Sequence, residues 1–367
     1  MKIPFVDLKV QYQLIKTEID MAIQKVIDET AFIKGKYVGQ FEKEYALSYG
    51  VKNVISCANG TDAIYISLKS MGIGAGDEVI TTALSWISTS ESITQAGAKA
   101  VFVDIDPDYY TIDDGKIEDK ITERTKAIIP VHLYGQPANM DAIMAIAKKH
   151  NLYVIEDCAQ AHFAQWKGQN VGTFGIAGTF SFFPGKNLGA YGDAGAIITD
   201  DEELAHKCRM FANHGALIKH NHLIEGINSR LDGLQASILS VKLKYIYEWN
   251  QKRYENACYY SKLLKNVKNV IAPEIRKNVK HIFHIYCIQV PDRDKLRNFL
   301  FQKGIETQIH YPTMLPFMPA YAYLNHNISE FPVAASVQDK ILSLPMYPEL
   351  SKEKIQYIVE SIREFYL

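Results

Sequence analysis

The chain has 367 residues, enough for about two domains of typical size, and its 47% hydrophobic and 22% charged residues exclude a disordered, collagen-like or low-complexity protein. Forty Lys and Arg residues against 41 Asp and Glu residues leave a formal net charge of -1, which excludes a global basic field for nucleic acid or an anionic membrane. Five scattered cysteines without a C-x-x-C pair, and no apolar stretch of about 18 residues, favour a cytoplasmic protein without a disulfide framework, zinc ribbon or membrane span.

Short apolar, β-rich runs alternate with helix-length segments over the first two thirds of the chain. The segment 61–71, for example, places Ile64, Leu68 and Met71 on one helical face. Such alternation predicts an α/β fold with a mostly parallel sheet covered by helices on both faces. The last two runs are joined by only a short Gly-rich connection, so they depart from simple alternation. The expected strands lie at 54–56, 79–82, 100–103, 127–131, 153–155, 179–182 and 194–199.

The last third of the chain has a different pattern. Residues 230–265 form a long stretch almost free of Gly and Pro, which predicts the helix that leaves the first domain. A strand at 282–290 and helices at 294–303 and 352–365 then predict a smaller α+β domain. We therefore expect a large domain at 1–245 and a small domain at 246–367, with the N-terminal segment a candidate to pack on the small domain.

The first motif with chemical meaning is the turn at 56–62, where a strand ends and a helix begins around Gly60 and Thr61. Free N–H groups at a helix N-terminus can hold a phosphate, although an ordinary helix cap has the same pattern. The turn is not a dinucleotide fingerprint, because the glycines at 72, 74 and 76 precede a strand. Nor does Lys186 end a Walker loop, since Phe180 stands where that loop needs glycine.

The second motif is a carboxylate, Asp157, at the end of the apolar run 153–155. Ligands of open α/β sheets bind at the carboxyl ends of the strands, so Asp157 could pair with a cationic ring nitrogen there. An acid that caps the next helix is an equally good interpretation of this segment alone.

The third motif is Lys186, which follows a strand and lies among four glycines and several aromatic residues in the segment 181–195. A lone lysine is usually a solvated surface charge. Here the apolar surroundings favour burial, which lowers a lysine pKa and yields the neutral amine that forms a Schiff base.

A phosphate cradle, an acid for a pyridinium nitrogen and an amine for an aldehyde are the groups that bind pyridoxal 5′-phosphate (PLP). With these motifs the sequence closely resembles the sugar-nucleotide aminotransferases of the DegT/StrS type, which are aspartate-aminotransferase-like PLP enzymes of fold type I. That resemblance implies a large domain with a seven-stranded, mostly parallel sheet. It extends over nearly the whole chain, through the segments 5–8, 41–42, 58–61, 132–136, 156–157, 184–189, 228–232 and 310–312.

The resemblance assigns roles residue by residue. It makes Lys186 the catalytic lysine that bonds the cofactor, and Asp157 the partner of the ring nitrogen. The cofactor phosphate would be held by Gly60, Thr61 and Ser181, and the ring hydroxyl by Gln160. Trp86 would stack on the ring, although a core tryptophan is the alternative. Asn228 would reach the phosphate of a neighbouring subunit, so the resemblance implies a homodimer with shared active sites.

The resemblance also implies the reaction and the substrate contacts. L-Glutamate would donate the amino group, with pyridoxamine 5′-phosphate (PMP) as the intermediate form of the cofactor, to a nucleotide-linked keto sugar. The bend at 228–232 resembles the branch that acts on dTDP-3-keto-6-deoxyhexoses; a UDP-3-keto uronic acid or a 4-keto-6-deoxy sugar remains the alternative. Substrate contacts would come from His162, Arg230, His310 and Tyr311, with a helix-start salt bridge as the alternative role of Arg230. No metal site is expected.

Two other classes of protein remain as alternatives. A catalytically silent PLP-binding regulator could share the fold, since fold does not guarantee chemistry. The sequence shows no appended DNA-binding segment and no loss of Lys186 that would favour this alternative. A nucleotide-dependent oxidoreductase is the default for an α/β chain, but the glycine fingerprint that it needs is missing.

Overall fold

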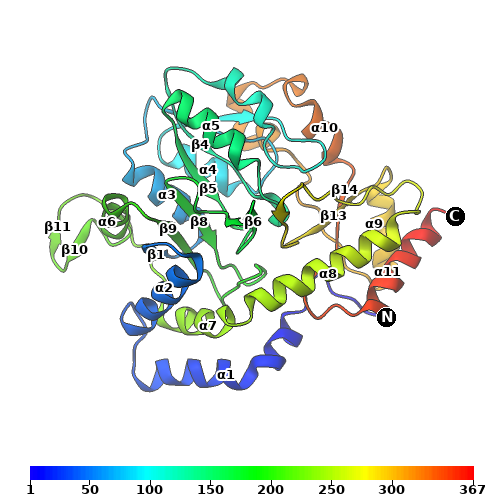
Figure 1. The fold of residues 1–367 in the computed structure, drawn as a ribbon, viewed down its shortest axis with the longest axis horizontal. Coiled ribbons are helices and arrows are strands. Elements are labelled where there is room, and N and C mark those ends of the chain that lie inside the picture. Colours follow the sequence, from blue (N-terminus) through cyan, green and yellow to red (C-terminus); the bar gives the residue numbers. More distant parts are fainter.

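The computed structural model describes residues 1–367, and its centre is a seven-stranded sheet in the order β1-β9-β8-β5-β4-β2-β3 (Figure 1). Only β9 runs antiparallel, pairing with β1 on one side and β8 on the other. The mostly parallel seven-stranded sheet is therefore confirmed. Its strands are β1 (Asn53–Cys57), β2 (Glu78–Thr82), β3 (Lys99–Val103), β4 (Thr125–Ile129), β5 (Tyr153–Asp157), β8 (Ala177–Ser181) and β9 (Gly195–Thr199).

Helices cover both faces of this sheet. Neighbouring residues of one strand face different cores: Ile197 packs with Ile64 of α3, whereas Ile198 packs with Phe41 of α2. Burial on both faces explains why the strands are near-continuous apolar runs instead of alternating ones. The helices around the sheet are α2 (Lys36–Tyr49), α3 (Gly60–Ser70), α4 (Ser88–Gln95), α5 (Met140–His150), α6 (Glu202–Phe211) and α7 (Gly233–Leu243).

The helical stretch predicted at 230–265 is two helices, so that expectation was wrong in its details. Asp232 caps α7 by accepting a 2.8 Å hydrogen bond from the backbone N–H of Gln235, which places residues 230–232 before the helix. The backbone N–H of Lys244 then donates to the Val241 carbonyl at 3.3 Å, and that of Tyr245 to the Lys242 carbonyl at 3.0 Å. These bonds span three residues instead of the four of an α-helix, so α7 ends there and α8 (Ile246–Leu264) begins as a separate helix. Apolar spacing alone does not reveal such a break.

A second core lies at the far end of α8. The antiparallel strands β13 (Tyr286–Gln289) and β14 (Ile341–Leu344) pack with α9 (Arg293–Gln302) and α11 (Lys352–Phe365). The helix between them in sequence, α10 (Pro332–Gln338), packs on the core of the large domain instead, through Ala334 and Val337. The backbone N–H of Ile3 donates to the Gly304 carbonyl at 2.8 Å, so the N-terminal segment packs on the second core, while α1 (Leu8–Asp28) packs along α7. The boundary at 245/246 stays a prediction, and part of the chain after it, including Met314 and Leu315, packs in the core of the large domain.

Shorter elements complete the chain. The hairpin of β10 (Ala216–Ile218) and β11 (Asn221–His222) projects from the body beside α6 (Figure 1). A three-stranded sheet contains β6 (Gln165–Trp166), β7 (Gln169–Asn170) and β12 (Val279–Lys280). Short 3₁₀ helices lie at Asp114–Lys116, Glu118–Lys120, Leu133–Gly135, Leu315–Phe317, Pro319–Leu324 and Ile328–Glu330.

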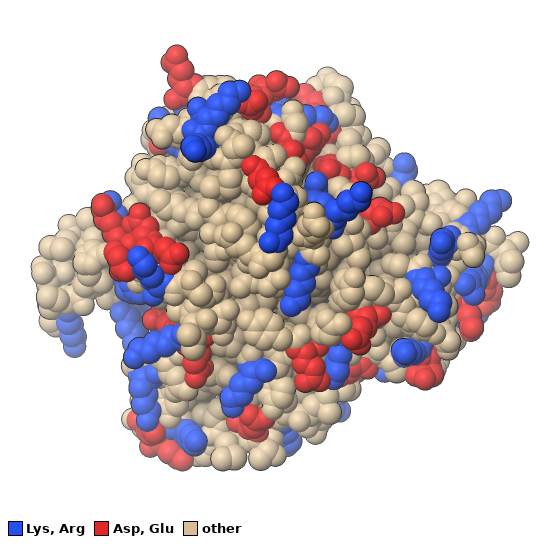
Figure 2. All heavy atoms as spheres, viewed as in Figure 1, with Lys and Arg blue, Asp and Glu red and all other residues tan.

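The surface carries both signs of charge. On the face shown in Figure 2, basic and acidic side chains are interspersed over most of the molecule. None of the helices combines the length and the apolar character that a bilayer crossing requires.

Candidate active site

A cavity of about 410 Å³ lies at the carboxyl ends of the parallel strands, where open α/β sheets bind their ligands. It also reaches His310 and Tyr311, which lie between α9 and the 3₁₀ helix at Leu315–Phe317. The structure brings nine of the predicted site residues to this one cavity: Gly60, Thr61, Trp86, Asp157, Gln160, Ser181, Lys186, His310 and Tyr311.

The turn after β1 forms one wall of the cavity. Asn59 caps α3 by accepting a 2.8 Å hydrogen bond from the Asp62 N–H, whereas the N–H groups of Gly60 and Thr61, at the start of the helix, have no intrahelical acceptor. A Cβ atom on Gly60 would lie 2.7 Å from the Cβ of Ser181, so only glycine lets this turn approach the end of β8. The Thr61 hydroxyl lies 2.7 Å from that of Ser88. Hydroxyl groups and helix N–H groups thus converge at a place suited to a phosphate.

Asp157 ends β5 and is held by two donors. The Thr89 hydroxyl donates to one carboxylate oxygen at 2.7 Å, and the backbone N–H of Ala159 donates to the other at 3.1 Å. Asp157 is buried, yet it lines the cavity. A fixed, desolvated carboxylate of this kind stabilises a cationic group placed opposite it.

Lys186 lies in the loop after β8, and its backbone N–H donates to the Phe183 carbonyl at 2.8 Å. Burial lowers the pKa of Lys186 to about 8, although the negative charge of Asp157 opposes part of the shift. A substantial fraction of the amine is therefore neutral near physiological pH. Such an amine can attack an aldehyde and can take up or release a proton.

Two buried asparagines fix the loop that carries Lys186. Asn187 donates to the side-chain oxygen of Asn250 on α8 at 2.8 Å and to the Ile282 carbonyl at 3.2 Å. Asn250 in turn donates to the His162 carbonyl at 2.9 Å. One helix residue thus ties the lysine loop to the segment that follows Asp157.

Gln160 connects the cavity wall to the His310–Tyr311 segment. Its side-chain oxygen accepts from the Tyr134 N–H at 2.7 Å, and its amide donates to the Tyr311 hydroxyl at 2.9 Å. The Tyr311 ring also contacts Trp86, with 5.7 Å between ring centroids. Burial and the nearby charge of Lys186 lower the pKa of His310 to about 4, so this histidine is neutral.

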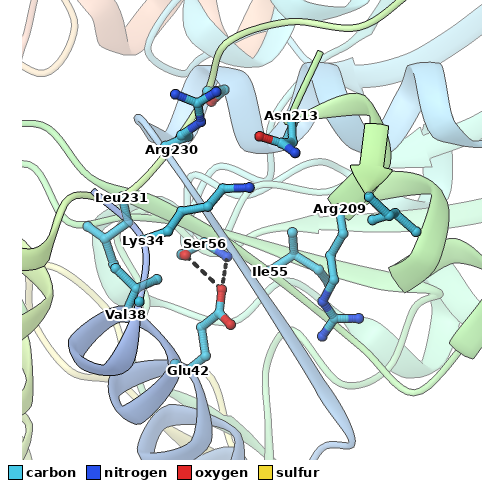
Figure 3. Close-up of a pocket in the computed structure, with 14 residues that line it drawn as sticks. Lys34, Val38, Glu42, Ile55, Ser56, Arg209, Asn213, Arg230 and Leu231 are labelled. Carbon is cyan, nitrogen blue, oxygen red and sulfur yellow. Dashed lines mark hydrogen bonds between the residues drawn. The ribbon is translucent and has the colours of Figure 1, made fainter. Parts of the chain in front are cut away.

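Three predicted residues do not line this cavity. His162 is buried behind it, with one ring nitrogen 2.9 Å from the Ser181 carbonyl and the other 2.9 Å from the Tyr45 hydroxyl. Asn228 is exposed on the bend before α7. Arg230 lines a second cavity of about 270 Å³, together with Lys34 and Asn213 (Figure 3).

Thr89 and Asn250 are site residues that sequence reasoning missed. No local pattern marks them, because their partners lie 68 and 63 positions away in the chain.

A buried group of His132, Glu156 and Cys158 has the composition of a metal site, but its hydrogen bonds show a structural role. Glu156 accepts from the N–H groups of Gly172, Phe174 and Gly175 at 2.7 to 2.9 Å. His132 accepts from the Ala138 N–H through Nδ1 at 3.1 Å, which leaves Nε2–H to donate to Glu156 at 3.1 Å. The donors occupy both oxygens of Glu156, which anchors the strand end that presents Asp157.

Comparisons with known proteins agree with this geometry. Residues 13–363 match the DegT/DnrJ/EryC1/StrS aminotransferase family. The chain is 49% identical to a "pleiotropic regulatory protein" of Geobacillus stearothermophilus, over 100% of this chain and 99% of that protein. It is 42% identical to a dTDP-3-amino-3,6-dideoxy-alpha-D-galactopyranose transaminase of Aneurinibacillus thermoaerophilus, over 99% of each chain.

Solved structures extend the likeness to three dimensions. The crystal structure of DesV from S. venezuelae superposes with a TM-score of 0.97 at 37% identity, covering 99% of this chain and 98% of that one. NtdA from Bacillus subtilis, with a TM-score of 0.91 at 34% identity over 99% of this chain and 85% of its own, was solved with bound PMP. The fold type I prediction is confirmed, and the cofactor prediction is confirmed at the level of the family. The match over nearly its whole length places this chain in the DegT/DnrJ/EryC1/StrS aminotransferase family.

Proposed function

We propose that this protein transfers the amino group of L-glutamate to a dTDP-3-keto-6-deoxyhexose, giving a dTDP-3-amino-3,6-dideoxyhexose. The observation that carries the proposal is the convergence of Lys186, Asp157 and the Gly60–Thr61 turn on one cavity. The name of the Aneurinibacillus relative supports the dTDP-linked substrate. Other relatives are named for UDP-linked sugars, so an aminotransferase for a UDP-3-keto uronic acid is the closest alternative.

The residues present fit PLP, because each chemical handle of that cofactor meets a matching group. Gly60 leaves no side chain in the way of a phosphate, and Thr61 and Ser181 add hydroxyls at the same wall. Asp157 would hold the proton of the ring nitrogen, Gln160 would contact the ring hydroxyl, and Trp86 would cover the ring face. Bound PLP supplies an aldehyde for the amino group and a ring that acidifies the α-proton of the amino acid.

The protein's own residues then move protons and exclude water. The Lys186 amine acts first as a general base that takes the α-proton of glutamate, and then as a general acid that gives a proton back. Its pKa of about 8 favours both transfers near neutral pH. Thr89 and Ala159 hold the Asp157 carboxylate in a fixed orientation, in which it would face the ring nitrogen. In the second half of the reaction the same groups act in reverse on the keto sugar. The net change is glutamate plus keto sugar to 2-oxoglutarate plus amino sugar.

We further propose that the active protein is a homodimer whose subunits complete each other's sites. Asn228 is exposed within its own chain, where it could reach the phosphate of a neighbouring copy. Apolar side chains on the nearby projecting segment support a docking role: Ile218 is 70% exposed and Leu223 is 66% exposed. A second copy that covers them would remove this apolar surface from water.

A PLP-binding regulatory protein is the second candidate, because the relative from Geobacillus stearothermophilus bears a regulatory name. Such a protein would bind the cofactor without turning over substrates. The complete set of Lys186, Asp157 and the turn around Gly60 favours catalysis over this alternative.

The decisive experiment is an assay of the purified, PLP-loaded protein with glutamate and a panel of dTDP- and UDP-linked 3-keto and 4-keto sugars. Mass spectrometry and NMR of the products would identify the aminated carbon. We expect amination at carbon 3 of a dTDP sugar by the wild type and none by Lys186→Ala. Normal rates in Lys186→Ala would overturn the catalytic assignment. Amination of another sugar only would discard the dTDP-3-keto substrate, and no turnover with any sugar would favour the regulatory alternative.

A further inference from the structure

The loop that carries Lys186 is closed at its base. The backbone N–H of Ala190 donates to the Phe182 carbonyl at 2.7 Å, just after the end of β8. A Cβ atom on Gly189 would lie 2.3 Å from the Pro184 carbonyl oxygen, so only glycine lets the two limbs of the loop approach this closely. Lys186 lies between these contacts, and its position therefore depends on what holds the returning limb of the loop.

The returning limb, residues 189–192, is bonded to one face of α7. The side-chain nitrogen of Lys242 donates to the Gly189 carbonyl at 2.6 Å. The side-chain oxygen of Gln235 accepts a 2.7 Å hydrogen bond from the Tyr191 N–H. The two α7 residues are separated by about two helical turns, so they lie on the same face of the helix. Two polar side chains of α7 thus hold the main chain of the limb at two points.

The side-chain nitrogen of Lys242 is enclosed by the limb. Lys242 is only 1% exposed, and its Nζ atom lies 4.6 Å from the centroid of the Tyr191 ring. Tyr12 of α1 packs edge-on against that ring, with 6.2 Å between the ring centroids. A carbonyl oxygen and an aromatic face both attract a cation. The amine is therefore directed at the limb and away from water.

The burial of Lys242 is difficult to explain by stability alone. It lowers the pKa of Lys242 to about 7, although the negative charge of Glu349 opposes part of the shift. A desolvated ammonium costs free energy, which an apolar side chain of similar length, such as methionine, would avoid. The contact of the amine with Gly189 therefore explains the lysine better than the packing of α7 does.

Apolar contacts seat the limb on the helix without fixing its exact position. Leu188 and Ala190 are fully buried in the same core as Ala236 and Leu239 of α7. Because the hydrophobic effect is not directional, this core permits small displacements of the limb along the helix. Hydrogen bonds are sensitive to both distance and angle. The polar contacts, more than the apolar ones, therefore set where Lys186 lies.

We propose that Lys242 and Gln235 are positioning residues that hold the loop so that the Lys186 amine reaches the aldehyde of the cofactor. This inference rests on the proposed function of Lys186. Neither α7 residue lines the cofactor cavity, so both act through the main chain of the limb. A displacement of about 1 Å between reacting atoms can cost about 100-fold in rate. The two contacts should therefore affect the rate of reaction at Lys186 more than the affinity for the cofactor.

The test follows the reaction of apoprotein with PLP. In this reaction the Lys186 nitrogen forms a double bond to the aldehyde carbon, and the aldehyde oxygen leaves as water with the two amine protons. Stopped-flow absorbance over a range of PLP concentrations gives the dissociation constant of the reversible complex and the first-order rate constant of covalent attachment. In Lys242→Met we expect this rate constant to fall about tenfold or more. The dissociation constant should stay within about twofold, because the groups that line the cavity are unchanged.

Two further variants complete the test. Gln235→Leu removes the other contact of α7 with the limb, and we expect a smaller fall in the same rate constant because the bond from Lys242 remains. Lys244→Met is the matched control, since Lys244 is an exposed lysine at the end of the same helix that pairs with Glu18 at 3.1 Å. It should attach PLP at the wild-type rate.

A second readout needs no cofactor. Labelling of apoprotein with acetic anhydride over a range of pH, followed by mass spectrometry, reports the pKa of the Lys186 amine, which burial lowers to about 8. A loosened loop admits water to the amine, so its pKa should rise toward the ordinary lysine value. In Lys242→Met we expect the midpoint of labelling to move up by about one pH unit or more.

The outcomes separate this inference from the proposed function. If wild-type apoprotein forms no covalent bond between Lys186 and PLP, the proposed function fails before the variants are compared. If the bond forms, a variant that keeps both the wild-type rate constant and the wild-type labelling midpoint removes its residue from the assignment, and such results for both variants overturn it. A change in the dissociation constant alone would assign α7 to cofactor binding instead.

Thermal unfolding distinguishes positioning from folding. Lys242→Met should unfold at or above the wild-type temperature, because the substitution removes a desolvated charge. A large loss of thermal stability with an unchanged rate constant would assign Lys242 to folding and overturn its positioning role. If Lys242→Met yields no folded protein, the argument from burial is wrong for Lys242, and Gln235→Leu decides whether α7 positions the loop.

Discussion

Thr89 donates a 2.7 Å hydrogen bond to the carboxylate of Asp157 from the helix that begins at Ser88. Because Ala159 donates to the other oxygen at 3.1 Å, the carboxylate is held from both sides. The orientation of the charge in the cofactor cavity therefore depends on a hydroxyl group that itself lies against the cavity wall.

Substitution of this hydroxyl should weaken cofactor binding. In Thr89→Val the carboxylate loses a donor at nearly constant side-chain volume, so we expect the dissociation constant of PLP to rise about tenfold. Thr94→Val is the control on the same helix, since the Thr94 hydroxyl donates to the Glu91 carbonyl at 3.0 Å. Absorbance titration of apoprotein with PLP measures both constants, and equal constants in the two variants would contradict the role of Thr89.

Asp157→Asn keeps the shape of the side chain and removes its charge. Without that charge the ring nitrogen is less readily protonated, so we expect kcat to fall about 100-fold or more, which corresponds to about 2.7 kcal/mol. Asp108→Asn, at an exposed carboxylate, is the matched control. Steady-state kinetics at saturating substrates would refute the proposal if Asp157→Asn kept more than half of the wild-type kcat.

The depressed pKa of Lys186 predicts how cofactor loading depends on pH. The neutral amine is the nucleophile, and its fraction rises with pH through the pKa of about 8. The rate of covalent PLP attachment to apoprotein should therefore increase from pH 6.5 to a plateau above about pH 9, with half of the change near pH 8. Stopped-flow absorbance measures the rate, with Lys186→Ala as the blank. A rate that still rises steeply near pH 10 would mean that the amine keeps its ordinary pKa.

Shared sites predict complementation between two inactive variants. A mixture of Lys186→Ala and Asn228→Ala should regain activity, because each heterodimer contains one site with an intact lysine and an intact neighbouring asparagine. Random exchange puts about half of the chains in heterodimers. Because each heterodimer has one working site of two, roughly a quarter of the wild-type number of sites should be active. Native mass spectrometry should verify the exchange. Proven heterodimers without activity would contradict a site shared between subunits.

The sequence predicts the parts of the site that lie at strand ends. Asp157 stands out because it ends an apolar strand, and Lys186 because it lies in the Gly-rich loop after another; parallel strands bring such ends to one edge of the sheet. Thr89 and Asn250 could not be found in this way, since their roles depend on contacts between distant segments. His162 shows a further limit. Its position beside the motif at Asp157 suggested the substrate pocket, but both ring nitrogens point to Tyr45 and Ser181 instead.

The hydrogen bonds of Asn250 have a consequence for how this kind of enzyme diversifies. They fix the lysine loop from inside the molecule, whereas Phe183, which lines the cavity, is more than half exposed. Substitutions at exposed lining positions such as Phe183 can therefore change which sugar fits without moving the amine away from Asp157. The architecture separates the chemistry, which stays constant, from recognition, which is free to drift, and new substrates can be acquired without a new catalyst.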